Sequence, residues 1–322
     1  MKDNGSPSGR SLLGRVAGAP ISWGICEVPG WGLQLPVERV LSEMHDLGLA
    51  ATELGAIGWL PTDADELMAT LDAHGLRAVG AFVPLVAHDE ARRNESIATA
   101  NEMAGLLQSV GAAHFVTALV NDPDDWSRPA LADQQWAHLI DVVDEVDEIA
   151  DAHGLGQVLH PHLNTLVETA DELARFLEDS DVPICLDTGH ITLGGGDPLE
   201  LARRHADRVA LVHLKDVRAD VASRLASGEF ELMAAVQAGL FAPLGAGDVA
   251  VADVIVELER QGYDGLYVLE QDVAITGGAP RYGAGPARDV ATSVAYLRSL
   301  EPTLRAMFRS GDGSTDPSPT TT

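Results

Sequence analysis

One unit recurs along the 322 residues and limits the possible folds more than any other feature. In each copy an amphipathic stretch ends at a glycine, and an apolar, often β-branched run begins two to four residues later. Glycine suits the position after a helix because it takes a positive φ without a Cβ clash. The copies with this glycine are HDLGLAATELG (45–55), AHGLRAVGAFV (73–83), SVGAAHFVTALV (109–120), HGLGQVLHPH (153–162) and RQGYDGLYVLEQD (260–272).

Three further apolar runs lack the glycine, namely AGAPISWG (17–24), VPICLDTGH (182–190) and RVALVHLKDV (208–217). Together the runs give eight strand candidates, and most are continuously apolar, as expected of parallel strands covered on both faces. Eight strand–helix units over about 290 residues predict a single (β/α)8 TIM barrel. Helix starts are predicted where a capping side chain precedes a carboxylate, at Thr62 to Glu66, Thr169 to Glu172 and Asp197 to Glu200.

A doubly wound open sheet is the alternative fold. No strand candidate is followed by a GxGxxG motif that opens a helix. The polar residues also follow many different strands instead of gathering at one crevice of an open sheet. The barrel is therefore favoured.

The predicted domain boundaries follow from composition. Residues 1–15 and 310–322 are rich in Gly, Ser, Pro and Thr and are expected to be disordered tails, with the barrel over 16–309. One long irregular insertion, 218–247, follows the seventh strand and would sit over the C-terminal face as a lid or a wall. Its apolar side chains for packing there are Phe230, Met233, Leu240 and Phe241.

Charge narrows the class of partner. Asp and Glu total 49 against 21 Lys and Arg, so the net charge of −28 repels phosphate backbones and anionic lipids. Nucleic-acid and membrane partners are not expected, which argues against a DNA-repair endonuclease on this scaffold. The two cysteines show no CxxC spacing and the N-terminus has no apolar signal core, so we expect a cytoplasmic protein.

The candidate active site follows from the barrel, because catalytic residues of such barrels lie at the carboxyl ends of the strands. Carboxylates and imidazoles that converge there could hold Mn²⁺ or a similar divalent cation. Strand by strand, the residues at the exits are Trp23; Glu53; Pro84 and His88; Asn121; His160 and His162; Asp187 and His190; His213, Lys215 and Asp216; and Glu270, Gln271 and Asp272.

Three of these residues are the predicted core of a metal site. Asp187 begins DTGH and could instead cap the next loop. His213 lies within an apolar strand, where a lone histidine is more often a hydrogen-bonded core residue. Glu270 ends a strand so apolar that its carboxylate needs a cation or donors. Because each of the three residues lies at the end of one of three neighbouring strands, metal ligation is the better interpretation.

The fourth ligand is expected from HPHLNTLVET after the fifth strand, which offers His160, His162 and Glu168. Glu168 would complete a Glu-Asp-His-Glu set. Since it directly precedes Thr169, it could also be a helix-start charge that complements the helix dipole.

A family resemblance rests on long, ordered motifs. HPHLNTLVET, LDTGHITLGGGDP, HLKDVR, GLFAPLGAGD and YDGLYVLEQD resemble the successive strand-end motifs of the inosose dehydratases, within the xylose isomerase-like sugar isomerase/epimerase barrels. APISWG and ATELG resemble the first two strands of that family, so the resemblance spans roughly residues 17 to 300.

The resemblance implies a divalent metal, Mn²⁺ or Co²⁺, on Asp187, His213, Glu270 and a fifth-strand ligand. It also raises the expectation of a homo-oligomer. The chain departs from the family in three places: Asn164 stands where a glycine is usual, His160-Pro161-His162 replaces three successive histidines, and Glu168 replaces a frequent glutamine.

The implied reaction is dehydration of a keto-cyclitol such as 2-keto-myo-inositol (scyllo-inosose). A proton is lost next to the ketone and a β-hydroxyl departs, while a divalent cation stabilises the enediolate. Glu270 or Glu168 is the expected base, and an expected proton donor is His162, His190 or Lys215. A keto-sugar isomerase or epimerase shares this intermediate, and a non-catalytic sugar-binding barrel is a further alternative.

Other residues are expected to contact the substrate. Glu53 could bind hydroxyl groups, and Trp23 or Trp31 could stack on the apolar face of a ring. Trp59, Trp126 and Trp136 are interpreted as packing residues. The remaining candidates for the pocket lining are His88, His160, Asp216 and Gln271.

Overall fold

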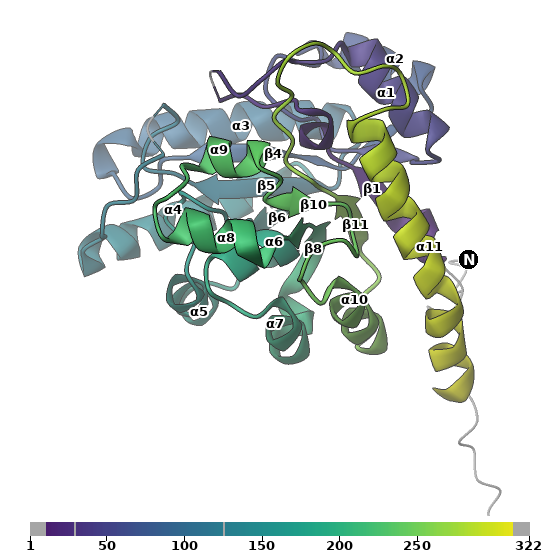
Figure 1. The fold of residues 1–322 in the computed structure, drawn as a ribbon. Coiled ribbons are helices and arrows are strands. Elements are labelled where there is room, and N and C mark those ends of the chain that lie inside the picture. The colour runs from purple at the N-terminus through teal and green to yellow at the C-terminus, as the bar shows by residue number, and fades with distance from the viewer. Residues whose placement is uncertain (1–10, 29, 125, 312–322) are drawn as a thin grey trace, which may run out of the picture.

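Strands and helices alternate along the chain, and the strands form a barrel surrounded by helices (Figure 1). The computed structural model describes residues 11–28, 30–124 and 126–311. The strands are β1 (Val16–Gly18), β2 (Ala51–Thr52), β3 (Arg77–Ala78), β4 (Gly80–Leu85), β5 (His114–Leu119), β6 (Gly156–Leu159), β7 (Ile184–Asp187), β8 (Val209–Leu214), β9 (Asp216–Val217), β10 (Phe241–Ala242) and β11 (Leu266–Leu269).

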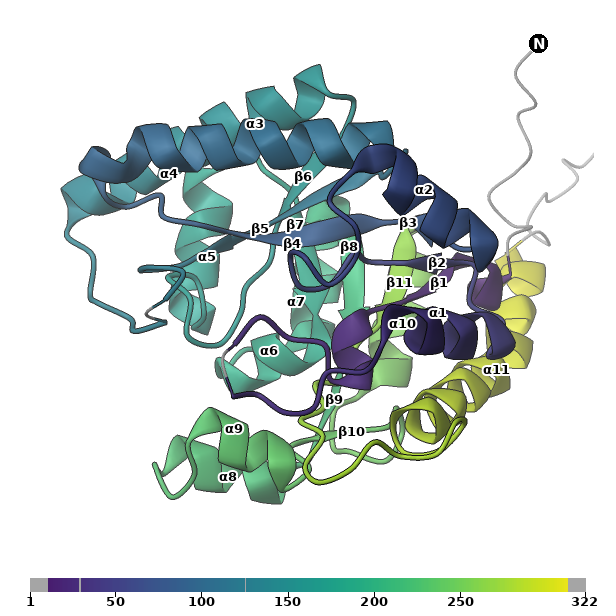
Figure 2. The same ribbon diagram turned by 90° about the horizontal axis from the view of Figure 1, so that it is seen from above.

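The α-helices are α1 (Val37–Asp46), α2 (Ala64–Ala73), α3 (Arg93–Ser109), α4 (Asp133–Ala152), α5 (Ala170–Asp179), α6 (Thr188–Leu193), α7 (Pro198–His205), α8 (Ala219–Ala226), α9 (Leu232–Gln237), α10 (Val251–Arg260) and α11 (Pro286–Gly311). Short 3-10 helices cover Leu12–Arg15, Pro20–Trp23, Glu90–Arg92 and Ala206–Arg208. Figure 2 shows α3 and α4 side by side along one side of the barrel.

The barrel is parallel throughout, with strand order β3-β2-β1-β11-β8-β7-β6-β5-β4. β3 and β4 are two halves of the single predicted third strand, separated by Val79. The Val79 amide donates to the Thr52 carbonyl at 2.9 Å, and its carbonyl accepts from the His114 amide at 3.0 Å. This residue therefore joins the two ends of the sheet, and the predicted barrel of eight strands is confirmed.

The strand pleat determines which residues point to the mouth of the barrel. Alternate residues of a strand face the same side. The barrel interior holds a separate apolar cluster that includes Ala51, Val158, Cys185, Leu211 and Val268. The residue two positions after each of them is ionisable: Glu53, His160, Asp187, His213 and Glu270. The same alternation that fills the interior therefore directs these side chains inward at its C-terminal end.

The predicted helix starts are close to the observed ones. Thr169 caps α5 in a capping box with Glu172, and Asp197 caps α7 by accepting from the Leu199 and Glu200 amides. α2 is capped by Asp63, one residue after the predicted Thr62. An aspartate side chain accepts such bonds as well as threonine does, which explains the shift.

The insertion after β8 is ordered rather than irregular. It contains α8, α9 and β10, which pairs antiparallel with β9. Asp216 was predicted to contact substrate, but it is buried and accepts from the amides of Gly245, Gly247 and Val249. That prediction is wrong, because the carboxylate is committed to holding the insertion against the barrel.

The ends of the chain extend the fold further than predicted. Leu12–Arg15 forms a 3-10 helix with buried Leu12 and Arg15, so the predicted N-terminal tail is too long by these residues. α11 runs to Gly311. The rest of the predicted tails, 1–10 and 312–322, lies outside the described residues. Among the described helices, none combines the length and the apolar character needed to cross a membrane.

A buried ion pair ties the first strand to the last. The Arg15 guanidinium, just before β1, pairs with Glu259 of α10 and donates to the carbonyls of Tyr263 and Gly265. The Tyr267 hydroxyl of β11 donates to the same Glu259 carboxylate at 2.8 Å. Because β1 and β11 are neighbours in the sheet, this network supports one seam of the barrel.

Replacing Arg15 with Met should lower the free energy of unfolding by about 3–5 kcal/mol, because the buried Glu259 charge loses its counter-ion and keeps only the Tyr267 hydroxyl as a donor. Urea unfolding followed by circular dichroism would measure the loss. The double variant Arg15→Met/Glu259→Leu should recover part of it, since it removes both charges. A single variant as stable as the parent protein would show that the pair does not support the seam.

Candidate metal centre and pocket

Four ionisable side chains meet at the C-terminal end of the barrel. His160, Asp187, His213 and Glu270 are all buried, and each offers one donor atom within 4.8 Å of the others. Parallel pairing of β7 with β8 sets Asp187 directly beside His213. The His213 Nδ1 lies 2.6 Å from Glu270 Oε2 and 3.0 Å from His160 Nε2. Four strands thus supply two imidazoles and two carboxylates to one point.

Asp187 combines the two roles that the sequence left open. Its Oδ1 caps α6 by accepting from the Gly189 and His190 amides, at 2.8 and 2.7 Å. Its Oδ2 is buried and has no hydrogen-bond partner among the described residues. Burial would raise the pKa of Asp187, but Lys215 and His160 outweigh it and keep the pKa below its usual value, so the group is a carboxylate.

These donors fit a divalent cation. A buried carboxylate oxygen without a donor is costly unless a cation or donor compensates it. Mixed imidazole and carboxylate ligands suit first-row metals such as Mn²⁺, Co²⁺ and Zn²⁺. A second possible grouping joins His160, Cys185 and His213. Burial raises the pKa of the Cys185 thiol to about 11, so the thiolate that a metal requires is disfavoured.

Lys215 is fully buried beside the cluster and holds its carboxylates in place. Its Nζ lies 2.9 Å from His190 Nε2, 2.8 Å from Glu270 Oε1 and 2.8 Å from Asp272 Oδ1. Burial would lower the pKa of Lys215, but Asp272, Glu270 and Asp187 outweigh it and raise the pKa. The ammonium has three donors, and these contacts account for all of them.

Glu168, the predicted fourth ligand, lies outside the cluster. Its Oε2 accepts from the main-chain amide of Asn164 at 2.5 Å and pairs with Arg128 Nε at 3.2 Å. The carboxylate thus supports the turn at Asn164, which has a φ of 63°. Asparagine tolerates this left-handed conformation better than most residues, which explains how it can replace glycine here. The structure places His160 in the cluster instead, two residues after the interior Val158.

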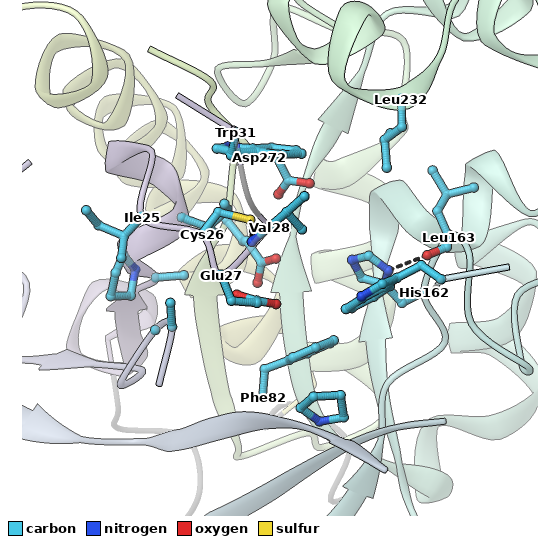
Figure 3. A pocket seen from close by; sticks show the side chains of 18 of the residues that line it. Ile25, Cys26, Glu27, Val28, Trp31, Phe82, His162, Leu163, Leu232 and Asp272 are labelled. Atoms are coloured by element: carbon cyan, nitrogen blue, oxygen red, sulfur yellow. Dashed lines mark hydrogen bonds between the residues drawn. The ribbon is translucent and has the colours of Figure 1, made fainter. Parts of the chain in front are cut away.

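A cavity of about 410 Å³ opens above the cluster (Figure 3). Glu53, His213 and Glu270 line its polar end, and the Glu53 Oε1 lies 3.0 Å from His213 Nε2. His162 also lines it, on the side opposite Glu27 (Figure 3). The predicted catalytic residues that the described lining does not include are Glu168, His190 and Lys215.

His162 is a neutral imidazole with one free nitrogen. Its Nδ1 lies 2.6 Å from the Leu163 carbonyl, which can only accept, so the proton is on Nδ1 and Nε2 carries the lone pair. Burial, together with His160 and Lys215, lowers the pKa of His162 to about 3. The ring packs against His190 with centroids 3.7 Å apart. This arrangement orients a proton acceptor.

The two candidate stacking tryptophans have different environments. Trp23 is fully buried, and its indole N–H donates to Glu43 Oε2 at 2.8 Å. The prediction that Trp23 contacts substrate is wrong, because the ring belongs to the core. Trp31 does line the cavity, with its indole N–H donating to the Val273 carbonyl at 2.8 Å.

His88 and Gln271 also do not belong to the described lining of the cavity. His88 is half-buried, and burial lowers its pKa. The Gln271 side chain is directed to the Phe241 carbonyl, and its main-chain amide donates to Ser22 Oγ at 2.9 Å. Gln271 is therefore aimed away from the cluster, which its position between the inward Glu270 and Asp272 explains.

Asp272, one of the residues expected at the strand exits, lines the cavity two residues after Glu270 and shares its inward direction. Burial raises the pKa of Asp272 to about 6, Glu270 adds to this, and Lys215 opposes it. Other lining residues were not recognised from the sequence. Glu27 lies on a loop with no periodic signal. Trp126, interpreted as a packing residue, lines the cavity and stacks on Phe82 with centroids 6.1 Å apart.

Comparisons with known proteins agree with this architecture. Residues 41–300 match the model of the family described as xylose isomerase-like TIM barrel. The chain is 33% identical to an inosose dehydratase of Geobacillus kaustophilus (strain HTA426) over 275 residues, 81% of this chain and 89% of that protein. It is also 33% identical to the rhizopine catabolism protein MocC of Rhizobium meliloti over 285 residues, 84% of this chain and 86% of that protein.

Solved structures show the same fold at lower identity. An L-ribulose 3-epimerase superposes with a TM-score of 0.69 at 18% identity, covering 94% of this chain and 99% of that one. The IOLI protein with a binding zinc atom superposes with a TM-score of 0.66 at 15% identity, covering 90% of this chain and 99% of that one.

Asp187→Asn should abolish tight binding of a divalent cation without unfolding α6, because the amide oxygen still caps the helix. We expect the affinity of metal-stripped protein for Mn²⁺ to fall by more than the ~10–100-fold that follows loss of a group supporting a ligand. Isothermal titration calorimetry would measure it.

Two further variants identify the fourth ligand. His160→Gln should weaken Mn²⁺ binding to a similar extent as Asp187→Asn, whereas Glu168→Gln should leave it nearly unchanged. If Glu168→Gln weakens binding as much as His160→Gln does, the assignment of His160 is wrong.

Proposed function

Because this chain belongs to the xylose isomerase-like TIM barrel family, we propose that it is a metal-dependent lyase that dehydrates a keto-cyclitol such as scyllo-inosose. The observation that carries the proposal is the cluster of His160, Asp187, His213 and Glu270, two of which, His213 and Glu270, line the polar end of an open cavity. Relatives named inosose dehydratase, which cover most of the chain, support this substrate class.

His160, Asp187, His213 and Glu270 would hold the cation, which we propose to be Mn²⁺ or Co²⁺. When bound, it supplies Lewis-acid stabilisation of the negative charge that develops on the ketone oxygen as the neighbouring proton leaves. Glu53 lines the cavity beside His213 and offers a carboxylate to the hydroxyl groups of the ring.

His162 is the group best placed to take the proton next to the ketone. It lines the cavity and its Nε2 lone pair is free to accept, although its lowered pKa makes the imidazole a weaker base than an ordinary histidine. Glu270 was the expected base, but its two oxygens already face His213 and Lys215. Glu168 lies outside the cavity lining. His162 therefore replaces both carboxylates as the proposed base.

Elimination also requires a proton for the departing hydroxyl. Glu27 lies on the side of the cavity opposite His162, and burial of its carboxyl, with the Glu270 charge nearby, raises its pKa. We assign Glu27 as the acid. The C–H electron pair forms the new double bond, the C–O bond breaks, and the hydroxyl leaves as water with the proton from Glu27. Lys215 positions Glu270 and Asp272 rather than acting on substrate.

The same two groups also fit an epimerase. A proton removed by His162 on one face and returned by Glu27 on the other would invert the carbon next to the ketone. Epimerisation differs from dehydration only in the fate of the shared intermediate, so the product distinguishes them.

Purified protein loaded with Mn²⁺ should convert scyllo-inosose in D₂O to a dione product that appears in the proton NMR spectrum. The Asp187→Asn variant serves as the control and should form none. Deuterium uptake next to the ketone without elimination would instead establish isomerase or epimerase chemistry. If the spectrum does not change at all, scyllo-inosose is not the substrate.

His162→Phe should lower kcat by about 10²–10⁴-fold, the usual contribution of a positioned general base. An aromatic ring is kept and the proton acceptor is lost, so Mn²⁺ affinity should stay within a few-fold of that of the parent protein. Steady-state kinetics and calorimetry would measure both. An unchanged kcat would mean that another group takes the proton.

A further inference from the structure

The cavity is larger and more apolar than an unsubstituted keto-cyclitol requires. Its volume of about 410 Å³ lies within the ~300–1,000 Å³ range of pockets for drug-sized ligands. Its acidic and imidazole lining residues are Glu53, His213 and Glu270 at the strand ends, together with Glu27, His162, Glu231 and Asp272. One ring bound there would leave the outer part of the cavity empty.

The outer part has an apolar wall, which we define as Val28, Trp31, Leu163, Leu232 and Met233. All five line the cavity. Figure 3 shows Val28, Trp31 and Leu232 on one side of the pocket and Phe82 on another. Trp31 presents only its apolar ring surface, because its indole N–H is bonded to the Val273 carbonyl.

Two segments far apart in sequence build most of this wall. Val28 and Trp31 belong to the loop before α1, and Leu232 and Met233 belong to α9 of the insertion after β8. They pack in a small apolar cluster that is separate from the main core. Val28, Leu232 and Met233 nevertheless remain only half-buried, because part of each faces the cavity.

The wall is poorly matched to a bare cyclitol. Such a ring carries a hydroxyl on every carbon except the ketone, and a hydroxyl buried against these side chains would lose its hydrogen bonds to water without replacement. Apolar side chains left partly exposed in a concave site favour an apolar ligand group instead.

We propose that the substrate of this enzyme is a keto-cyclitol that carries an apolar substituent, an alkyl or aryl group in ether linkage, and that the apolar wall binds this substituent. The proposal rests on the proposed function for the ring itself. The keto-cyclitol ring occupies the polar end beside the metal cluster, and the substituent extends between the loop before α1 and α9.

Binding of unreactive cyclitols tests the wall without depending on catalysis. We expect mono-O-benzyl-scyllo-inositol to bind at least ~10-fold more tightly than scyllo-inositol, the gain from burying roughly 60 Å² of apolar surface. Isothermal titration calorimetry would measure both affinities. Equal affinities, or weaker binding of the benzyl ether, would overturn the proposal.

Substitutions locate the effect. Leu232→Asn and Val28→Thr should each remove most of the roughly 10-fold preference for the benzyl ether over scyllo-inositol. Leu225→Asn is the matched control, because Leu225 packs in the same apolar cluster on α8 but does not line the cavity. Its preference should equal that of the parent protein. An equal loss in this control would show that the wall acts only by supporting the fold.

Turnover separates this proposal from the proposed function. The Mn²⁺-loaded enzyme should act on mono-O-benzyl-scyllo-inosose with a kcat/KM at least ~10-fold above that for scyllo-inosose. Turnover of both ketones without preference for the ether would contradict the apolar wall and leave the lyase assignment intact. Tight binding of the benzyl cyclitol with turnover of neither ketone would contradict the lyase and support the wall.

Discussion

The burial of charge at one end of the barrel is the constraint on which the rest of the site depends. Asp187, Glu270 and Lys215 are removed from water, and single charges there would be unstable without partners. Lys215 compensates the carboxylates, and His160 and His213 lie beside them. Each group keeps its charge because the others are in place. Such a cluster persists only if the strands that carry it are held in register.

The strand pleat connects this electrostatic cluster to the fold. Small and branched side chains of the strands fill the interior of the barrel. The next side chains on the same strands that point inward, two positions further along, form the cluster. The ionisable side chains of the cluster therefore lie at the strand ends, which the barrel holds in fixed positions. Most of the apolar wall comes from the loop before α1 and the insertion after β8, which can vary without disturbing the strands.

Most of the wrong predictions concern the direction in which a side chain points rather than its chemical type. Trp23 follows a strand, but its side chain lies in the core, where its indole N–H donates to Glu43. Asp216 lies next to the inward Lys215 and so faces the other way, where it holds the insertion. Glu168 has the right chemistry for a ligand, but Arg128 and the Asn164 amide engage it. In each case a partner distant in sequence decided where the polar group points.

The sequence by itself determined the eight strand–helix units and the metal-ligand candidates Asp187, His213 and Glu270. These conclusions depend on local order along the chain: the helix period, the glycine after the helix, and an ionisable residue at the end of an apolar run. Only the tertiary structure decided that His160 joins them in place of Glu168, that His162 and Glu27 face each other across a cavity, and that the outer wall is apolar. Those features depend on distances between side chains on separate strands and loops, which are set by register and packing and leave no periodic trace in the sequence.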